Sequence, residues 1–411
     1  MENRRVVITG MGTVSPIGNT VEKSWDSLVN GRSGIGKITY FDTSLFKAKL
    51  DAEVKDFNPR DWMEKQDMLR SDKYVHYAFA ATTEAIADSG IEGTVDPERF
   101  AVYYGSGIGG ICTFSAEMRK LIDRGPGRVS PFLIPMMIPN MAAGMLAIRF
   151  GCKNAAIPAV TACASGTNAI GEAVRAIRHG YADAAITGGS EAAISEIGVA
   201  GFQNMQALSV AEDPEAASLP FDRRRAGFVI GEGAATLILE EYERARKRGA
   251  HIYGEVVGYG STCDAYHITA PSPDSDGGKR AIEEALREAG WKEDEKLYIN
   301  AHGTGTPMND RCETKAIKRA LGEENARKAM INSSKSMTGH MLGAAGAFEA
   351  IVAVKTLECG IVTPTINLTE PDPDCDLDYT PLTARSWQSD LAISISLGFG
   401  GHNAVLAFRR I

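Results

Sequence analysis

Short apolar runs that end in glycine alternate along this chain with segments in which apolar residues recur at every third or fourth position. The apolar runs are typical of strands that are buried on both faces of a mixed or parallel sheet. Strands are expected at residues 5–10, 101–105, 184–188, 252–258, 297–301, 393–396 and 404–408. Their alternation with helical segments predicts an α/β fold.

Three helices are indicated by the periodicity of their apolar residues. A division of the chain into two parts is indicated after a run of charged residues. Each of these helices is followed by a glycine suited to a C-terminal cap. A charged run at 240–248 is interpreted as a solvated helix face. A new strand is expected directly after this run. We place a boundary between them, which divides the chain into two halves, 1–250 and 251–411. The helices lie at 75–86, 281–289 and 316–321, with Gly90, Gly290 and Gly322 beyond them.

The composition is ordinary for a globular protein with a full core: hydrophobic residues make up 44% of the 411 residues and charged residues 23%. The net charge of -8 argues against a general nucleic-acid binder, because phosphate binding requires a basic surface. The stretch 133–148 is apolar, but Pro135, Pro139, Asn140 and Gly144 interrupt it, so no membrane span is expected. It is interpreted as a buried, methionine-rich wall.

The cysteines are sparse and contain no metal-binding spacing. Among the seven there is no CxxC pair, and none lies beside a histidine pair in the sequence. This spacing predicts neither a zinc site nor a disulfide framework. The chain also leads directly into an apolar strand, so we expect no signal peptide and a cytoplasmic protein.

Cys163 lies in the segment Thr-Ala-Cys-Ala-Ser-Gly, between an apolar stretch at 155–160 and a helical pattern that ends at Gly180. This order predicts a cysteine at or just before a helix N-terminus. The free N–H groups and the helix dipole there favour a thiolate and can hold an oxyanion. A small buried cysteine with a packing role is the alternative. Pro158 indicates an edge strand, which could lie at a subunit interface.

Two histidines lie in loops rich in glycine and threonine. His302 follows a strand in Asn-Ala-His-Gly-Thr-Gly-Thr, and His340 ends the segment Lys-Ser-Met-Thr-Gly-His. His340 is predicted to open a helix over 341–357, whose dipole would keep the imidazole neutral. Two neutral imidazoles that face one point could stabilise an enolate. Taken singly, each histidine could equally be structural.

Residues 398–403, Gly-Phe-Gly-Gly-His-Asn, form a glycine-rich turn between the last two predicted strands. Gly398 and Gly400 allow backbone N–H groups to approach a ligand closely. Phe399 could be a gate whose N–H serves as the second oxyanion donor. An ordinary hairpin turn is the alternative. The segment 105–110 resembles a dinucleotide loop only loosely, and no suitable acidic residue follows it, so no NAD is expected.

Seven segments in order resemble the decarboxylating β-ketoacyl-acyl-carrier-protein synthases, and the resemblance covers nearly the whole chain. The closest likeness is to the bacterial synthase II group, which elongates longer acyl chains. The resemblance implies a thiolase-like duplicated fold, five-layered αβαβα, in a homodimer. It implies an acyl carrier protein with a phosphopantetheine arm as the partner, and no redox cofactor or catalytic metal. The segments are 6–18, 131–140, 161–167, 220–233, 300–306, 335–346 and 398–403.

The resemblance also assigns roles residue by residue. Cys163 matches the nucleophile, and His302 and His340 match the decarboxylation pair. The other matches are Lys335 and Glu349 as supporting charges, Phe399 as gatekeeper, Thr304 and Thr306 as ligands of the phosphopantetheine arm, Ile108 and Phe202 as walls of the acyl pocket, and Lys65, Arg70 and Arg128 as docking residues for the acidic carrier protein.

Three positions depart from the commonest family pattern. Gly305 stands where serine is frequent, and His402 stands where threonine often does. Ile395 stands where asparagine is common, which bears on the structural monovalent cation that some members hold near this loop.

Three alternative functions fit the sequence less well. A biosynthetic thiolase would place a second cysteine in the C-terminal turn, which has none here. An initiating synthase of the Cys-His-Asn type is disfavoured by His340, and an inactive polyketide partner subunit would usually lack Cys163. The resemblance therefore implies a ping-pong decarboxylative Claisen condensation of an acyl-enzyme with a malonyl carrier protein, in fatty acid chain elongation.

Overall fold

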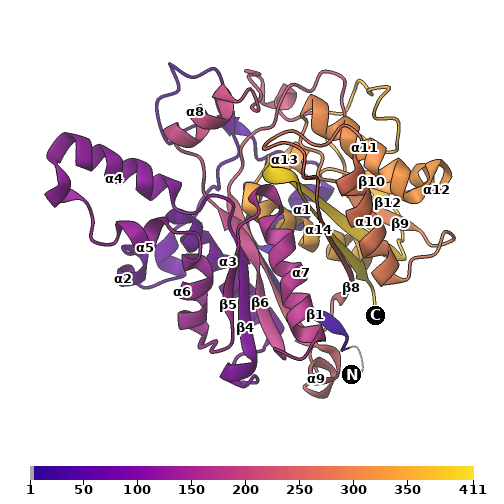
Figure 1. Cartoon of the computed structure of the whole chain (residues 1–411), viewed down its shortest axis with the longest axis horizontal. Coiled ribbons are helices and arrows are strands. Elements are labelled where there is room, and N and C mark those ends of the chain that lie inside the picture. Colours follow the sequence, from indigo (N-terminus) through magenta and orange to yellow (C-terminus); the bar gives the residue numbers. More distant parts are fainter. Residues whose placement is uncertain (1–3) are drawn as a thin grey trace.

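The computed structural model describes residues 4–411 as two sets of strands and helices that share one large sheet (Figure 1). Its ten strands have the order β10-β9-β13-β14-β8-β1-β7-β6-β4-β5. The first half contributes β1 (Val6–Val14), β4 (Phe100–Gly105), β5 (Ala156–Ala159), β6 (Ala184–Glu191) and β7 (Gly233–Glu241). The second half contributes β8 (Gly254–Cys263), β9 (Leu297–Asn300), β10 (Met330–Asn332), β13 (Leu391–Gly398) and β14 (His402–Arg409).

The two halves have the same strand topology. Outward from the centre of the sheet, the strand order is β1-β7-β6-β4-β5 in the first half and β8-β14-β13-β9-β10 in the second. Strands that correspond in chain order therefore occupy corresponding places. The last strand, β7 or β14, is antiparallel to both neighbours, and the second strand, β4 or β9, is parallel to both. The halves meet where Val7 and Ile8 of β1 pair with β8. Such a match is typical of a duplicated architecture.

Helices cover and separate the two halves of the sheet (Figure 1). On the outer faces, α3 (Lys73–Ser89) packs on β1 and β7, and α10 (Asp276–Ala289) packs on β8 and β14. Between the halves, α7 (Ser165–Arg178) packs on β4 and β6, while α14 (Ala345–Cys359) contacts α7, β7 and β13. The five layers that the family resemblance implies are therefore present.

The remaining elements connect these layers or lie at the surface. The helices are α1 (Val21–Val29), α2 (Lys65–Met68), α4 (Ile111–Arg124), α5 (Leu133–Met137), α6 (Met141–Phe150), α8 (Glu196–Asn204), α9 (Tyr242–Lys247), α11 (Pro307–Leu321), α12 (Glu323–Lys328) and α13 (Lys335–Thr338). Two short antiparallel pairs join β2 (Gly36–Lys37) to β3 (Leu50–Asp51) and β11 (Ile361–Val362) to β12 (Arg385–Ser386).

All the predicted strands are present, but β1 and β8 continue past the glycines that were expected to end them. A Cβ atom on Gly10 or Gly12 would lie within 2.3 Å of a carbonyl oxygen of α3. A Cβ atom on Gly258 or Gly260 would lie within 2.1 Å of a carbonyl oxygen of α10. These glycines therefore allow close helix packing within a strand, in the same way in both halves.

The segment 133–148 is not the buried wall that its apolar sequence predicts. It forms α5 and most of α6, and the exposed fractions of Ile134 and Ile148 are 57% and 81%. Pro158 does lie in an edge strand, since β5 ends the sheet. Among residues 4–411, no helix is both long and apolar enough to cross a membrane.

Candidate active site

Three side chains from remote segments converge between the two halves. The Cys163 Sγ atom and one ring nitrogen from each of His302 and His340 all lie within 4.8 Å of one another. The two imidazole rings meet edge to face, with their centroids 5.2 Å apart. The exposed fractions of Cys163, His302 and His340 are only 8%, 2% and 2%. A nucleophile and two imidazoles thus share one small, largely dry space.

The two central helices begin in the same way, and this start positions the nucleophile. A 3-10 turn, Ala162–Ala164, precedes α7, and a second one, Leu342–Ala344, precedes α14. The first residue of each turn has a left-handed backbone, with φ +51° at Ala162 and +48° at Leu342. This conformation costs a non-glycine residue about 1 kcal/mol or more. The strained turn places Cys163 at the N-terminus of α7, as the sequence predicts.

The local context predicted for His340 is wrong. The helix does not open at residue 341, because α14 begins at Ala345 after the strained turn. The imidazole is neutral for another reason: burial, followed by the positive charge of Lys335, holds the pKa of His340 well below its usual value. Burial, Lys335 and His340 in turn hold the pKa of His302 well below its usual value.

Lys335 and Glu349 form a buried ion pair beside the two histidines. Lys335 is 1% exposed, and its Nζ donates a hydrogen bond to Glu349 Oε1. Burial raises the pKa of the Glu349 carboxyl to about 7, and Lys335 opposes that rise. The pair can therefore impose a positive potential on both imidazoles without leaving an isolated buried charge.

Burial of Cys163 disfavours the thiolate that the sequence predicts. It raises the pKa of the Cys163 thiol to about 12, although Lys335 and the N–H groups of Phe399 and Cys163 lower it. The group is thus a thiol at neutral pH, and attack must be coupled to loss of its proton. A neutral imidazole within 4.8 Å is a ready acceptor.

The alkylation rate of Cys163 by a small neutral electrophile such as iodoacetamide is expected to rise about tenfold per pH unit from pH ~6 to ~9. Only the thiolate reacts, and its fraction grows in this way at every pH below the raised pKa of about 12. Peptide mass spectrometry measures the rate at Cys163 separately from the other cysteines. A plateau near pH 7 would show instead that a stable thiolate is present.

Two backbone donors face the sulfur and can hold an oxyanion. The N–H groups of Phe399 and Cys163 are near enough to the Cys163 sulfur to lower the pKa of its thiol. The glycine turn packs directly on the nucleophile, since a Cβ atom on Gly398 would lie 3.3 Å from the Cys163 nitrogen. Gly400 has φ +81°, which favours glycine there. The turn therefore delivers a donor to the reacting centre.

Aromatic and apolar side chains surround this centre. Cys163 belongs to a buried apolar cluster that includes Phe228, and Ile108 and Phe202 pack against it. The ring of Phe399 lies 6.4 Å from that of Phe202, and Phe228 meets His340 edge to face at 5.3 Å. The two residues matched to an acyl pocket and the residue matched to a gate thus lie around the nucleophile.

The two threonines matched to the phosphopantetheine arm lie together after β9. The Thr304 and Thr306 hydroxyl oxygens are 3.0 Å apart. Between them, Gly305 has φ +77°, a backbone that glycine adopts more easily than the serine common at this position. The departure from the family pattern therefore fits the local conformation.

The structure does not bring the three basic docking candidates to the reacting centre. Lys65, Arg70 and Arg128 are exposed and lie on or next to α2 and α4. These two helices are at the left of Figure 1. None of the three basic residues pairs with an acidic residue within the part of the chain that the structure describes. The guanidinium of Arg70 stacks over the ring of Phe132 at 4.9 Å.

Three buried carboxylates that the sequence reasoning missed fix the loops of the site. Glu313 accepts hydrogen bonds from the N–H groups of His302 (2.6 Å) and Gly303 (2.8 Å). Asp310 accepts from the N–H groups of Phe221 and Gly305. Glu191, at the end of β6, accepts from Gly107 (2.7 Å), Ile108 (3.2 Å) and Gly343 (3.0 Å). Acidic residues three apart in α11, directly after the His302 loop, were a usable signal.

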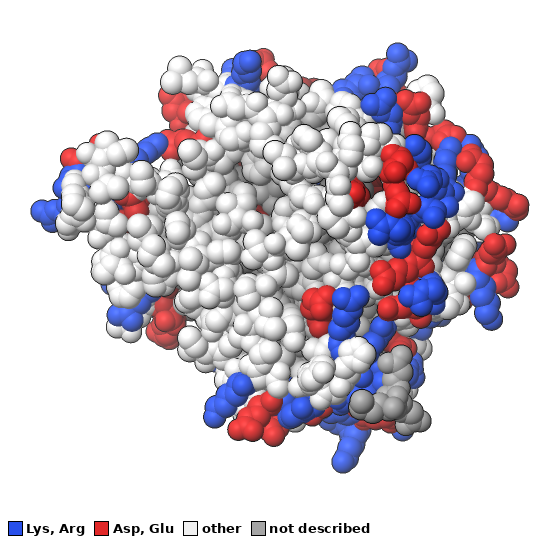
Figure 2. Space-filling model, viewed as in Figure 1, with Lys and Arg blue, Asp and Glu red and all other residues white. Residues whose placement is uncertain are grey.

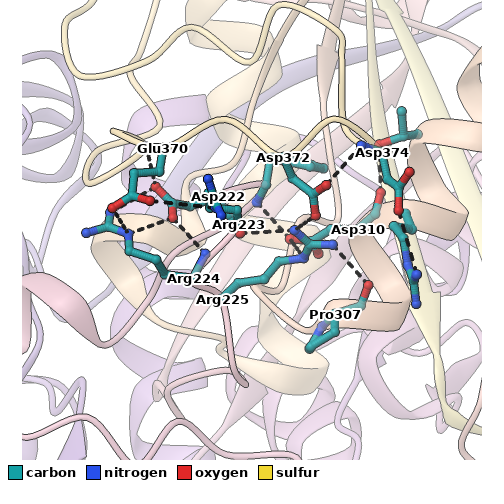
Figure 3. A network of polar contacts seen from close by, with 12 residues as sticks. Asp222, Arg223, Arg224, Arg225, Pro307, Asp310, Glu370, Asp372 and Asp374 are labelled. Carbon is teal, nitrogen blue, oxygen red and sulfur yellow. Dashed lines mark hydrogen bonds and ion pairs between the residues drawn. The ribbon is translucent and has the colours of Figure 1, made fainter.

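A buried arginine joins this loop to its surroundings (Figure 3). Arg225 is 3% exposed at its side chain, pairs with Asp372 at 2.5 Å and lies 3.6 Å from Asp310. It also donates to the carbonyl oxygens of Thr306 (3.3 Å) and Pro307 (3.1 Å). The network therefore fixes the segment that carries the two threonines.

Comparisons with known proteins agree with this geometry. A model of the beta-ketoacyl synthase N-terminal domain matches residues 3–245, and one of the beta-ketoacyl synthase C-terminal domain matches residues 253–369. The chain is 50% identical to a 3-oxoacyl-acyl-carrier-protein synthase 2 of Synechocystis sp., covering 100% of this chain and 99% of the relative. It is 49% identical to the enzyme of that name from Staphylococcus aureus, with the same coverage.

A solved structure shares the fold as well. It is a type II polyketide ketosynthase, AntDE, in complex with its acyl carrier protein, AntF, and bound to the hexaketide. It is 36% identical to the present chain, with a TM-score of 0.91 and 100% of both chains covered.

Proposed function

Because the chain belongs to the beta-ketoacyl synthase family, we propose that it condenses an acyl thioester with a malonyl thioester, both held on an acyl carrier protein, to give a 3-ketoacyl thioester. The observation that carries the proposal is the convergence of the Cys163 sulfur with one nitrogen of His302 and one of His340 within 4.8 Å. The two relatives named synthase 2 support fatty acid chain elongation as the setting.

In the first half of the proposed reaction, the Cys163 sulfur attacks the carbonyl carbon of an acyl thioester. The thiol proton passes to a neutral imidazole as the sulfur attacks, and then to the departing carrier thiolate. The N–H groups of Cys163 and Phe399 stabilise the negative oxygen of the tetrahedral intermediate. The products are an acyl-cysteine and a free carrier thiol.

In the second half, a malonyl thioester takes the place of the departed carrier. The imidazole that relayed the thiol proton first changes tautomer, so that His302 and His340 both carry a proton on the nitrogen that faces the site. They donate hydrogen bonds to the thioester carbonyl oxygen of the malonyl group, which becomes the enolate oxygen as carbon dioxide leaves. The enolate carbon attacks the acyl-cysteine carbonyl and expels the Cys163 thiolate, which takes a proton from solvent. No oxidation state changes in this cycle, and no step in it is routed through a metal.

Turnover by the isolated chain tests this function. Mixed with acyl and malonyl carrier proteins, the purified protein is expected to release one carbon dioxide for each 3-ketoacyl thioester formed. Product mass and released carbon dioxide are measured together. A chain that binds acyl carriers but never decarboxylates malonyl carrier would instead be a non-catalytic partner subunit, and release of coenzyme A from two acetyl groups without carbon dioxide would indicate a thiolase.

The carrier partner and the cellular setting complete the proposal. The solved ketosynthase that holds its acyl carrier protein supports a carrier as partner, and Lys65, Arg70 and Arg128 are the proposed docking residues. Seven free cysteines agree with the cytoplasm as the proposed location. The structural monovalent cation stays a prediction. Ile395, buried in β13, offers no side-chain oxygen as a ligand.

We also propose a homodimer, in which a second copy covers the face around β5. This face carries the half-exposed or exposed side chains of Ile134, Ile148, Ile157 and Val160. Figure 2 shows a broad surface without charged residues across the middle of the molecule, with charged residues at its margins. The outer edge of β5 also leaves its backbone groups available to another strand. A partner at this edge would bury both features.

Replacing both Ile148 and Ile157 by lysine is expected to convert the dimer to a monomer. Two charges in an apolar interface would lose their hydration, at a cost of several kcal/mol. Sedimentation equilibrium measures the molecular mass. The matched control is Leu45→Lys, at an apolar residue with 94% exposure, which should leave the mass unchanged. A double variant that remains dimeric would place the interface elsewhere.

A further inference from the structure

We propose that Cys163, His302 and His340 also form a binding site for Zn²⁺, through which this ion inhibits the enzyme. This inference goes beyond the condensation reaction, which uses no metal in any step. The three ligand atoms, one sulfur and two imidazole nitrogens, all lie within 4.8 Å of one another. Sulfur and imidazole nitrogen are the ligands that zinc prefers in proteins.

Three of the four ring nitrogens of His302 and His340 are buried without a hydrogen-bond partner in the part of the chain that the structure describes. Neither nitrogen of His340 has a hydrogen-bond partner within the described chain, and the same holds for Nδ1 of His302. His340 is 2% exposed, and one of its two ring nitrogens is the atom that lies within 4.8 Å of the Cys163 sulfur, so a buried polar atom without a partner faces this space. Buried polar atoms without a partner are rare and indicate a ligand, an ion or a water at that point.

The distances fit a zinc ion after small rotations of the side chains. With Zn–S bonds of about 2.3 Å and Zn–N bonds of about 2.0 Å, ligand atoms around a tetrahedral ion lie roughly 3.3–3.6 Å apart. The present separations do not exceed 4.8 Å, so each has to shorten by at most ~1.5 Å to bring the three atoms onto one ion. Three protein ligands leave one position open for water, as in catalytic zinc sites.

The surroundings indicate reversible inhibition and not a resident metal. The Nδ1 atoms of both histidines lack the carboxylate or carbonyl partner that a permanent site uses to orient its ligands. Loss of such partners typically lowers metal affinity ~10- to 100-fold. The charge of the nearby Lys335 is balanced by Glu349, so the space is not closed to a cation by uncompensated positive charge.

Zinc binding and catalysis should exclude each other. The ion would displace the thiol proton of Cys163 to solvent and form a bond with the sulfur. Its bonds to the two imidazoles would remove the donors that the enolate needs. Conversely, an acyl group on Cys163 converts the sulfur to a thioester, which is a poor ligand. The free enzyme should therefore be sensitive to zinc, and the acyl-enzyme should be protected.

Metal binding by the full-length protein tests the site independently of catalysis. Wild type is expected to hold one Zn²⁺ per chain in equilibrium dialysis, and Co²⁺ should give a thiolate-to-cobalt absorption band. Cys163→Ser and His340→Ala should each lower the affinity by ~10-fold or more. Cys359→Ser, at an exposed cysteine at the end of α14, is the matched control and should bind as wild type does.

Two further experiments use the wild-type protein, so they do not depend on whether a variant folds. Prior acylation of Cys163 should abolish the cobalt band, and a chelator should restore the activity of zinc-treated enzyme. Mg²⁺, which prefers oxygen ligands, should not inhibit. Metal binding that is unchanged by acylation and by Cys163→Ser would overturn the proposal and indicate an adventitious site. An inactive protein that still binds zinc in this pattern would count against the proposed condensation only.

Discussion

Replacement of Cys163 by serine is expected to abolish the acyl-enzyme and to lower condensation by on the order of 10⁴-fold or more. Serine keeps the size of the side chain and the strained turn that begins at Ala162, so the fold should be unaffected. Its hydroxyl is a much weaker nucleophile at neutral pH, since the burial that raises the pKa of the Cys163 thiol to about 12 disfavours an alkoxide still more strongly. Intact-protein mass spectrometry after mixing with an acyl thioester measures the effect.

The control is Cys359→Ser, which changes an exposed cysteine outside the site. It should acylate as wild type does, with a mass increase of one acyl group. If Cys163→Ser still gains that mass at a rate close to the wild-type rate, another residue must be the nucleophile, and the site described around Cys163 has no covalent role.

Replacement of His302 or His340 by alanine is expected to separate the two half-reactions. Decarboxylation of malonyl carrier should fall ~10²- to 10³-fold in each variant, since each loses one donor to the enolate oxygen. Acylation of Cys163 should remain within ~10-fold of wild type, because one imidazole is left to accept the thiol proton. Release of labelled carbon dioxide and acylation by mass spectrometry measure the two steps separately.

The double variant adds a second test of the same idea. The two imidazoles act on one oxygen atom, so their losses should not add, and the double variant should be little slower in decarboxylation than the worse single one. His251→Ala, an exposed histidine beside Tyr253, is the control and should change neither step. Equal losses in both half-reactions for a single variant would mean that the imidazole acts before the enolate forms.

Much of the fold could be predicted from the periodicity of apolar residues. The caps after α3 and α10 follow from Gly90 and Gly290, which both adopt the left-handed conformation. Gly322 also has a positive φ of +77°, but its ψ of 153° differs from that of the left-handed helix and leads the chain directly into α12. The lengths of β1 and β8 were predicted too short, because their glycines allow a helix to pack closely and do not end the strand. Nothing local in the sequence shows that Gly12 faces a backbone oxygen of α3.

The sequence predicts which residues form the site but not their protonation states. Cys163, His302 and His340 each sit in a short motif that can be found in the sequence. Their protonation depends on burial and on Lys335, which the fold supplies from other segments. The helix dipole argument for His340 failed because a strained turn at Leu342 delays α14. Local sequence shows neither the turn nor the depth of burial.

The carboxylates show the same limit. Glu191 lies at the end of an apolar strand, and only the fold reveals that it receives N–H groups from the loops at Gly107 and Gly343. The sequence also gave no sign of the proposed zinc site. Its three ligands, Cys163, His302 and His340, come from segments that are far apart along the chain and form no metal-binding motif.

A single-turnover chase of the isolated acyl-enzyme tests the central claim most directly. Protein acylated with a labelled acyl group is freed of excess donor, mixed with malonyl carrier and examined by peptide mass spectrometry. We predict that the label starts on Cys163 and leaves it as a 3-ketoacyl thioester, with one carbon dioxide released per label transferred. Label found on another residue, or label that stays on Cys163 while carbon dioxide is released, would contradict the account.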